Sequence, residues 1–204
     1  MLQTQNLAAR RGEALLFSDL SFSLTRGTAL VIGGANGSGK TTLLRMLAGL
    51  TQPAGGTISW RGRAVRGLDS EMRAETLFIG HVPALKDDLT AQENLASLAH
   101  LHGATASIEA LREALGAWAL SRQRALPARV LSQGQRRRIG LARLNLVPRS
   151  LWLLDEPATA LDDAGVAMLC SAIAAHIGGG GIAVIATHQD LALPPATTRF
   201  LRLK

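Results

Sequence analysis

Residues 34–41 read GANGSGKT and could hold a chain of phosphates. Glycines in this spacing let the backbone curl so that successive amide N–H groups face one anion, at the positive N-terminal end of a helix. Lys40 could place a charge between the β- and γ-phosphates, and the Thr41 hydroxyl could bind a bridging Mg²⁺. The pattern predicts a nucleotide phosphate site made of Gly34, Ala35, Asn36, Gly37, Ser38, Gly39, Lys40, Thr41 and Thr42.

Two adjacent carboxylates, Asp155 and Glu156, follow the apolar stretch LWLL. After a buried strand they project from the carboxyl edge of the sheet, where ligands bind in α/β folds. We expect Asp155 to hold Mg²⁺ through water and Glu156 to polarise the water that attacks the γ-phosphate. His188 follows another apolar stretch, which predicts an imidazole beside the same edge.

A mainly parallel sheet is needed to bring these residues together. Alternation predicts a strand at 20–24, and apolar runs predict buried strands at 29–33, in SLWLLDEP at 150–157 and at 182–187. GTISW at 56–60 is a further strand, and helices are expected after Gly39 and at 163–177. Strands that alternate with helices indicate an α/β fold.

From about residue 90 to residue 130 the strand signals vanish, and two amphipathic helices are predicted. This shift suggests a helical subdomain inserted into a nucleotide-binding core of residues 1–89 and 131–204. A chain of 204 residues fits one such domain.

Composition narrows the function classes. The chain has no apolar stretch long enough to span a membrane and no apolar signal-peptide core, so we expect a cytoplasmic protein that reaches a membrane through a partner. The net charge is +7, but only 3% of residues are aromatic and none is tyrosine, which argues against nucleic acid as a partner. Cys170 lies among apolar residues at helical spacing and is interpreted as a core residue without chemistry.

LSQGQ at 131–135 precedes the carboxylate strand and opens a helical run through Val147. It resembles the signature sequence of ABC-transporter ATPases, with Gln133 where glycine is usual. The resemblance implies a P-loop NTPase fold with an N-terminal antiparallel β part, ATP and Mg²⁺ as cofactors, and catalytic roles for Glu156, His188 and Lys40. It also implies that Ser132, Gly134 and Gln135 cap the γ-phosphate of ATP held by a second, head-to-tail copy, and that Asp162 links the two copies.

Several positions depart from that family. His81 stands where the family usually has a magnesium-contacting glutamine, and we expect it to act in nucleotide binding or coupling. The usual adenine-stacking aromatic is absent, and Arg10 or Arg11 could stack a guanidinium plane instead. His100 and His102 are interpreted as surface residues. The run at 136–138 is interpreted as a solvated helix face, with a phosphate-sensing role as the second interpretation.

Within the ABC ATPases, the chain resembles the ATP-binding subunits of bacterial cytochrome c maturation systems. The shared segments are ALLFSDLSF, TTLLRMLAGL, IGH followed by LKDDLTAQENL, LSQGQRRRIGLARL and ATHQDL. The resemblance implies ATP hydrolysis coupled to haem export or to release of a haem carrier, with a separate membrane-spanning permease subunit and haem-handling maturation proteins as partners. It also implies a peripheral place on the cytoplasmic face of the inner membrane.

Three alternatives stay open. One is an ABC ATPase for another solute, which only the identity of its partner would separate. Another is a soluble, non-transport ABC ATPase acting on ribosomes or DNA, although such proteins usually fuse two cassettes in one chain. The third is a phosphate-loop kinase. The LSQGQ motif and the position of Glu156 directly after Asp155 both argue against it.

Overall fold

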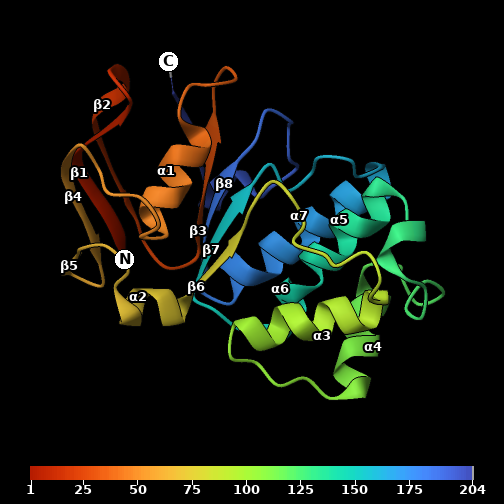
Figure 1. Ribbon diagram of the computed structural model, residues 1–204. Coiled ribbons are helices and arrows are strands. Elements are labelled where there is room, and N and C mark those ends of the chain that lie inside the picture. Colours follow the sequence, from red (N-terminus) through yellow and green to blue (C-terminus); the bar gives the residue numbers. More distant parts are fainter. Residues whose placement is uncertain (204) are drawn as a thin grey trace. The chain divides into compact units, whose positions relative to one another are not determined.

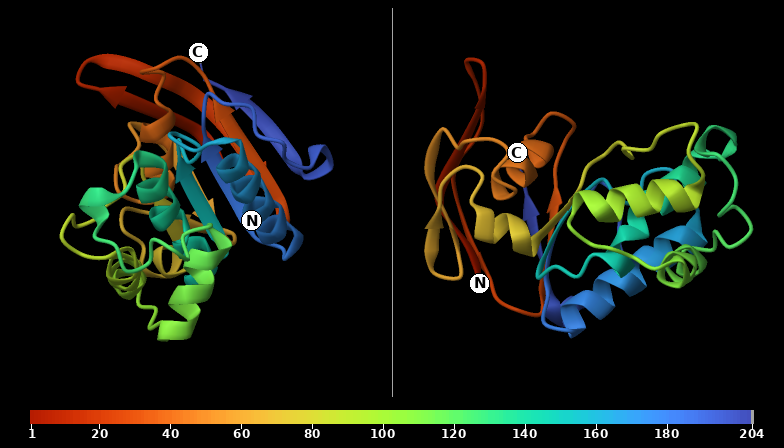
Figure 2. Two further views of the ribbon diagram at one scale, coloured as in Figure 1. Left: turned by 90° about the vertical axis from the view of Figure 1, so that its right-hand side faces the viewer. Right: turned by 60° about the horizontal axis from the view of Figure 1, so that its bottom comes forward.

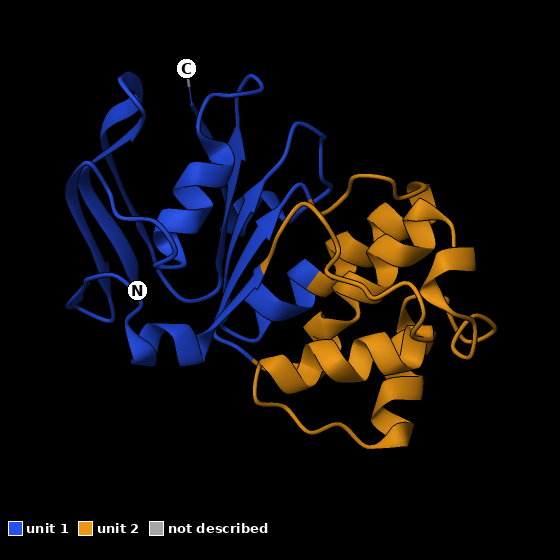
Figure 3. Ribbon diagram, in the orientation of Figure 1, with its two compact units in different colours: residues 1–78, 149–156, 173–204 blue, residues 79–148, 157–172 orange. Residues whose placement is uncertain are grey.

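The computed structural model describes residues 1–203, which form two compact units (Figure 3). Among the described residues, unit 1 comprises 1–78, 149–156 and 173–203. Unit 2 comprises residues 79–148 and 157–172. Unit 2 is longer than the helical segment 90–130 expected from sequence, because helix α5 (Gln133–Leu141), which lies beyond residue 130, packs on helix α3 (Ala91–Leu101).

Unit 1 contains an antiparallel sheet in the strand order β2-β1-β4-β5 (Figure 1). Its strands are β1 (Leu2–Arg11), β2 (Ala14–Leu24), β4 (Gly55–Trp60) and β5 (Arg63–Val65). The predicted antiparallel part is therefore confirmed. Strand β1 was not predicted from the sequence, because its alternation is interrupted by the positive φ of Asn6 and a register shift between Thr4 and Leu7.

The second sheet of unit 1 has the strand order β6-β7-β8-β3-β9, and its pairs β7–β8, β8–β3 and β3–β9 are parallel. The bounds are β3 (Thr28–Gly33), β6 (Thr76–Ile79), β7 (Leu151–Asp155), β8 (Ile182–Ala186) and β9 (Thr198–Arg202). This sheet confirms the predicted α/β class. The edge strand β9 was not predicted, because its five residues show neither an apolar run nor a strict alternation: Thr198 is buried, whereas Phe200 is 75% exposed.

Helix α1 (Lys40–Leu47) packs on β7 and β8, and the short helix α2 (Ser70–Glu75) precedes β6. A 3-10 turn, η2 (Pro195–Thr197), leads into β9. The core of unit 1 is built from aliphatic side chains of both sheets and α1, among them Leu2, Leu7, Leu24, Leu30, Ile32, Leu43, Leu47, Leu153 and Val184. This packing fixes the position of the carboxyl ends of β3, β7 and β8.

Unit 2 is helical (Figure 2). Its elements are α3 (Ala91–Leu101), α4 (Ile108–Ala117), the 3-10 turn η1 (Ala128–Val130), α5 (Gln133–Leu141), α6 (Arg143–Leu146) and the first part of α7 (Asp163–Gly178). Thr90 and Glu93 form a capping box at the start of α3, and Ser107 caps α4. In residues 1–203, no helix has the length and apolar character that a membrane crossing requires.

The helical run predicted from the LSQGQ motif consists of two consecutive helices, α5 and α6. The expected run through Val147 breaks at Ala142, where the amide of Asn145 bonds the carbonyl of Ala142 in a tight turn. Trp118 Nε1 donates to Asn145 Oδ1 at 2.9 Å, so α6 is attached to the end of α4. The predicted helical run is therefore confirmed as far as Leu146, with a single turn residue, Ala142, that divides it into two helices.

Candidate functional site

The loop between β3 and α1 wraps around the amino group of Lys40. Its Nζ donates to the carbonyls of Gly34 at 2.8 Å and Ala35 at 3.1 Å, and the residue is only 7% exposed. Ser38 Oγ is buried and has no hydrogen-bond partner among the described residues. A buried hydroxyl without a partner is costly, so this loop is suited to receive a polar ligand.

Gly39 precedes α1 with φ +97°, and its Cα is crowded by β2. A Cβ at this position would lie 3.0 Å from the Phe17 ring and 3.3 Å from the Cβ of Leu16. No side chain caps α1, and its first turn contains no acidic residue. The first amides of α1 are therefore free of a competing carboxylate, which favours an anion.

Beside this loop, the Thr41 hydroxyl donates to Asp155 Oδ1 at 3.1 Å. Asp155 ends β7 and is 2% exposed. A hydroxyl and a carboxylate in this arrangement are hard oxygen donors of the kind that Mg²⁺ prefers. The donor set fits the ion that the sequence predicted.

Glu156 is the next residue, and its backbone has the left-handed φ of +46°. Its amide bonds the carbonyl of Ala186, so the residue is fixed to the end of β8. Its carboxylate Oε2 lies 2.9 Å from Nδ1 of His188, with side-chain exposures of 14% for Glu156 and 60% for His188. The structure thus brings Lys40, Thr41, Asp155, Glu156 and His188 to one edge of the parallel sheet.

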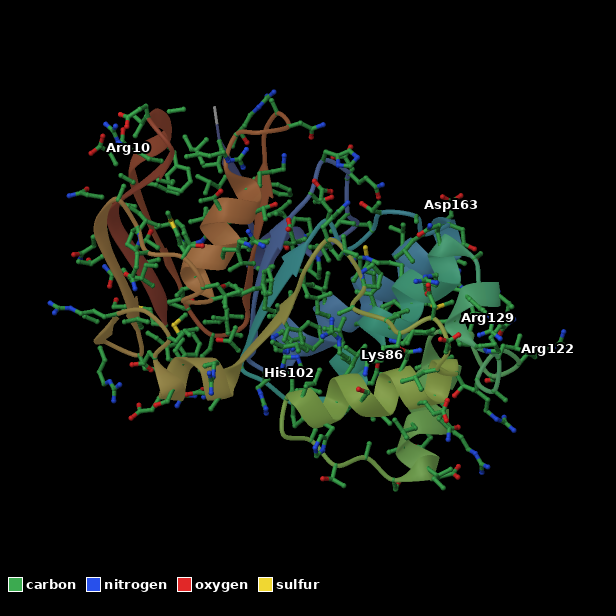
Figure 4. All side chains as sticks on the ribbon, in the orientation of Figure 1. Arg10, Lys86, His102, Arg122, Arg129 and Asp163 are labelled. Atoms are coloured by element: carbon green, nitrogen blue, oxygen red, sulfur yellow. The ribbon has the colours of Figure 1, made fainter. Side chains whose placement is uncertain are left out.

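Arg10 and Arg11, the expected substitutes for a stacking aromatic, are both exposed at the end of β1 (Figure 4). Phe17, which the sequence analysis did not single out, is half-buried and lies directly against the loop at Gly39. Its place in β2 opposite Ala9 offered no signal by itself, because the contact with Gly39 depends on how the two sheets of unit 1 pack. The stacking role of the two arginines stays a prediction.

The LSQGQ motif forms a second site, within unit 2. Ser132 caps α5: its Oγ accepts from the amide of Gln135 at 3.2 Å, and its amide donates to Gln135 Oε1 at 2.9 Å. A cavity of about 270 Å³ opens here, lined by Ser132, Gly134, Gln135, Arg138, Ala160 and Asp162. The motif therefore presents a concave helix N-terminus with polar walls.

Gly134 and Asp162 fix the shape of that cavity. A Cβ on Gly134 would lie 2.7 Å from the carbonyl oxygen of Ala160, whereas Gln133 is exposed. Position 134 therefore has no room for a side chain, whereas position 133 accommodates the glutamine side chain at the surface. Asp162 pairs with Arg138 and accepts from the amide of Gly165 at 3.0 Å; the guanidinium, followed by this amide, holds the pKa of Asp162 below its ordinary value.

His81 has an exposed side chain, and its carbonyl accepts from Arg137 Nη1 at 2.9 Å. The arginine run at 136–138 was wrongly interpreted as a solvated face, because Arg137 is 3% exposed and bonds three backbone carbonyls. Charge alone could not reveal this, since the partners are main-chain groups from distant segments.

Two other side-chain predictions have different outcomes. Cys170 is buried in α7, as expected for a core residue. His100 is exposed, but His102 is half-buried, with its Nε2 3.5 Å from Arg143 Nη1, so the surface interpretation is wrong for His102. Among residues 1–203 no group of three or more histidine, cysteine, aspartate or glutamate side chains forms a metal site.

Comparisons with solved structures show the fold. A putative ABC transporter ATP-binding protein from Pyrococcus furiosus matches with a TM-score of 0.85 at 22% identity, covering 99% of this chain and 96% of that chain. The ATP-binding cassette MJ0796, solved as a dimer in a post-hydrolysis state with ADP and phosphate, matches with a TM-score of 0.83 at 24% identity over 100% and 94%.

Comparisons of sequence are more specific. The ABC transporter family model matches residues 17–159. Cytochrome c biogenesis ATP-binding export protein CcmA 2 from Cupriavidus metallidurans is 48% identical over 94% of this chain and 90% of its own length. CcmA from Nitrosomonas europaea is 45% identical over 100% and 95%. The chain therefore belongs to the ABC transporter family, as an ATP-hydrolysing subunit similar to the CcmA proteins.

Proposed function

We propose that this chain is the ATP-hydrolysing subunit of an ABC complex for c-type cytochrome biogenesis. It would couple ATP hydrolysis to haem export or to release of a haem carrier. Sequence identity of 44–48% to proteins named for cytochrome c biogenesis supports the pathway. The observation that carries the chemistry is the pair Glu156–His188 beside the phosphate loop and the Thr41–Asp155 contact.

Residues 34–42 would hold the triphosphate. Lys40 would turn its ammonium group from the carbonyls of Gly34 and Ala35 toward the β- and γ-phosphates, and the first amides of α1 would bond phosphate oxygens. Ser38 would find in the ligand the hydrogen-bond partner that its buried hydroxyl lacks among the described residues. Thr41 and Asp155 would hold Mg²⁺, which would supply positive charge to offset the negative charge of the triphosphate.

Glu156 would accept a proton from the water that attacks the γ-phosphate. His188, 2.9 Å from its carboxylate, would orient that group and face the γ-phosphate from its exposed side. The left-handed backbone of Glu156 supports this role, because strained conformations of non-glycine residues gather at functional sites.

A second copy, arranged head to tail, would complete each site. The cavity at Ser132, Gly134 and Gln135 would cap the γ-phosphate bound by the other copy, and Asp162 would contact that copy. His81 and the loop at residues 81–90 would pass the movement to a separate membrane-spanning subunit. The complex would sit on the cytoplasmic face of the bacterial inner membrane, with haem-handling proteins as further partners and no nucleic acid.

The variant Lys40→Ala should lose ATP binding and hydrolysis together. A hydrogen bond to a charged group contributes about 1.5–3 kcal/mol, so we expect affinity for ATP to fall roughly 10- to 100-fold. Isothermal titration and phosphate release would measure the two losses. Arg45→Ala, on the exposed side of the same helix, is the matched control and should bind ATP normally. Normal affinity in Lys40→Ala would contradict the proposed phosphate site.

The pathway is tested by isolating the complex from native membranes. A tagged Glu156→Gln variant, with ATP and magnesium present, should remain in the ATP-bound dimer and preserve weak contacts. We expect a polytopic membrane subunit, haem-handling proteins and a haem absorption band to copurify. Lys40→Ala, which should not close the dimer, is the control for non-specific recovery.

The other outcomes separate the alternatives. A different permease without haem proteins would keep the ATPase and overturn the cytochrome assignment. Ribosomes, DNA or an absence of any membrane subunit would overturn the transporter assignment itself.

A further inference from the structure

Three consecutive arginines of α5 each bind a different part of unit 2. Arg136 Nη1 pairs with Asp87 at 2.7 Å and donates to the carbonyl of Ala128 at 3.1 Å. Arg138 pairs with Asp162. Between them, Arg137 points inward. The helix that presents the LSQGQ motif is therefore connected to several loops through its side chains.

Arg137 makes the most extensive of these connections. Its Nη1 donates to the carbonyls of Gly80 and His81, both at 2.9 Å, and its Nε donates to the carbonyl of Pro157 at 3.1 Å. The planar guanidinium has donors that point in several fixed directions, which an ammonium or an amide group lacks. One side chain thus joins α5 to two loops that are about 76 residues apart in the sequence.

Burying this charge is costly, so a purely structural role would be served better by an apolar residue. Arg137 is 3% exposed. A second buried cation, Arg143, lies near enough that burial, followed by the charge of Arg137, lowers its pKa to about 10. Replacing buried charged groups by apolar ones of similar size is often neutral or stabilising. The retained charge points to a role in geometry.

The two loops that Arg137 joins carry the groups of interest. His81 opens the loop that would reach the membrane partner, and Pro157 is covalently bonded to Glu156. Between residues 157 and 162 the chain also forms the wall of the LSQGQ cavity. A shift of α5 must therefore be followed by both loops, as long as the guanidinium bonds persist.

We propose that Arg137 is a positioning residue that fixes the loop at His81 and the segment after Glu156 to the LSQGQ helix, so that closure of that helix on ATP is passed to both. This inference rests on the proposed function. Arg137 would then also set the rate of hydrolysis, although it lies outside the phosphate loop, the two carboxylates and the LSQGQ motif.

The test compares Arg137→Gln and Arg137→Lys in the full chain with Arg112→Gln, a control on the exposed face of α4. Three quantities are measured per folded molecule: affinity for ATP, kcat, and amide hydrogen exchange. We expect Arg137→Gln to lower kcat at least about tenfold while affinity changes less than about twofold, a split that lost folding would not produce. Exchange should rise at residues 80–83 and 157–162 and stay unchanged in unit 1.

Arg137→Lys keeps the positive charge but lacks the directed donors of the guanidinium, so we expect the same fall in kcat and the same local rise in exchange. This variant replaces Arg137→Gln in the test if Arg137→Gln does not fold. An unchanged kcat, or exchange that rises evenly over the whole chain, would overturn the inference. Hydrogen exchange needs no hydrolysis. If the original chain hydrolyses no ATP but the Arg137 variants still show faster exchange only at residues 80–83 and 157–162, the positioning contacts are supported and only the proposed function is overturned.

Discussion

Glu156→Gln should bind ATP as tightly as the original chain and hydrolyse it about 10²- to 10⁴-fold more slowly, the contribution typical of a general base. Glutamine has the same shape and can still accept the hydrogen bond from His188, which lies 2.9 Å from Oε2, but it cannot take a proton from water. Single-turnover phosphate release measures the chemical step, and equilibrium titration with ATP measures binding.

The control is Glu13→Gln, which removes an exposed carboxylate from the turn between β1 and β2 and should leave both quantities unchanged. With ATP, Glu156→Gln should also accumulate as a dimer in light scattering, because turnover no longer reopens it. Turnover at the original rate would remove Glu156 from the role of base. A parallel loss of ATP binding would place the residue in binding instead.

Ser132→Arg should spare ATP binding by the single chain and reduce hydrolysis at least about 100-fold. The larger, positively charged side chain would fill the cavity of about 270 Å³ beside Gly134 and Gln135, where the γ-phosphate of the other copy is expected. The ATP-dependent dimer should then be absent in light scattering, even in the Glu156→Gln background.

Part of any effect at Ser132 must come from the lost helix cap, which costs about 1 kcal/mol. Ser132→Ala has the same loss without filling the cavity, so the difference between the two variants measures the effect of the blocked site.

Mixing two inactive variants gives a sharper test. A mixed dimer of Ser132→Arg with Lys40→Ala contains one site with an intact phosphate loop and an intact LSQGQ motif. Recovered hydrolysis in the mixture would require action between copies, and a mixture as inactive as its components would count against it.

Local signals predicted the parts of the site that lie at the ends of apolar strands. Three strands of almost purely apolar sequence lead to these residues: β3 to residues 34–41, β7 to Asp155 at its end and Glu156 after it, and β8 to His188. Parallel pairing brings the ends of these strands together. The Glu156–His188 contact then follows from the neighbouring positions of β7 and β8. For these residues, the apolar strand pattern of the sequence was sufficient to predict their position at the sheet edge.

Residues whose surroundings come from distant segments could not be predicted in this way. Arg137 resembles its neighbours in sequence, and only the packing of unit 2 brings three carbonyls to it. Strand β1 was not predicted because a bulge near Asn6 shifts its buried positions by one residue. Similarly, Phe17 reaches Gly39 through the packing of two sheets.

The bonds from Lys40 to Gly34 and Ala35 have a consequence for the entropy of ligand capture. A lysine side chain that becomes ordered on binding loses roughly 1.5–2 kcal/mol of rotamer freedom. Here the ammonium group is already confined by two carbonyls and is 7% exposed, so most of that loss occurs when the chain folds. The loop is thus preorganised, and ATP meets a receptor that exchanges one set of hydrogen bonds for another.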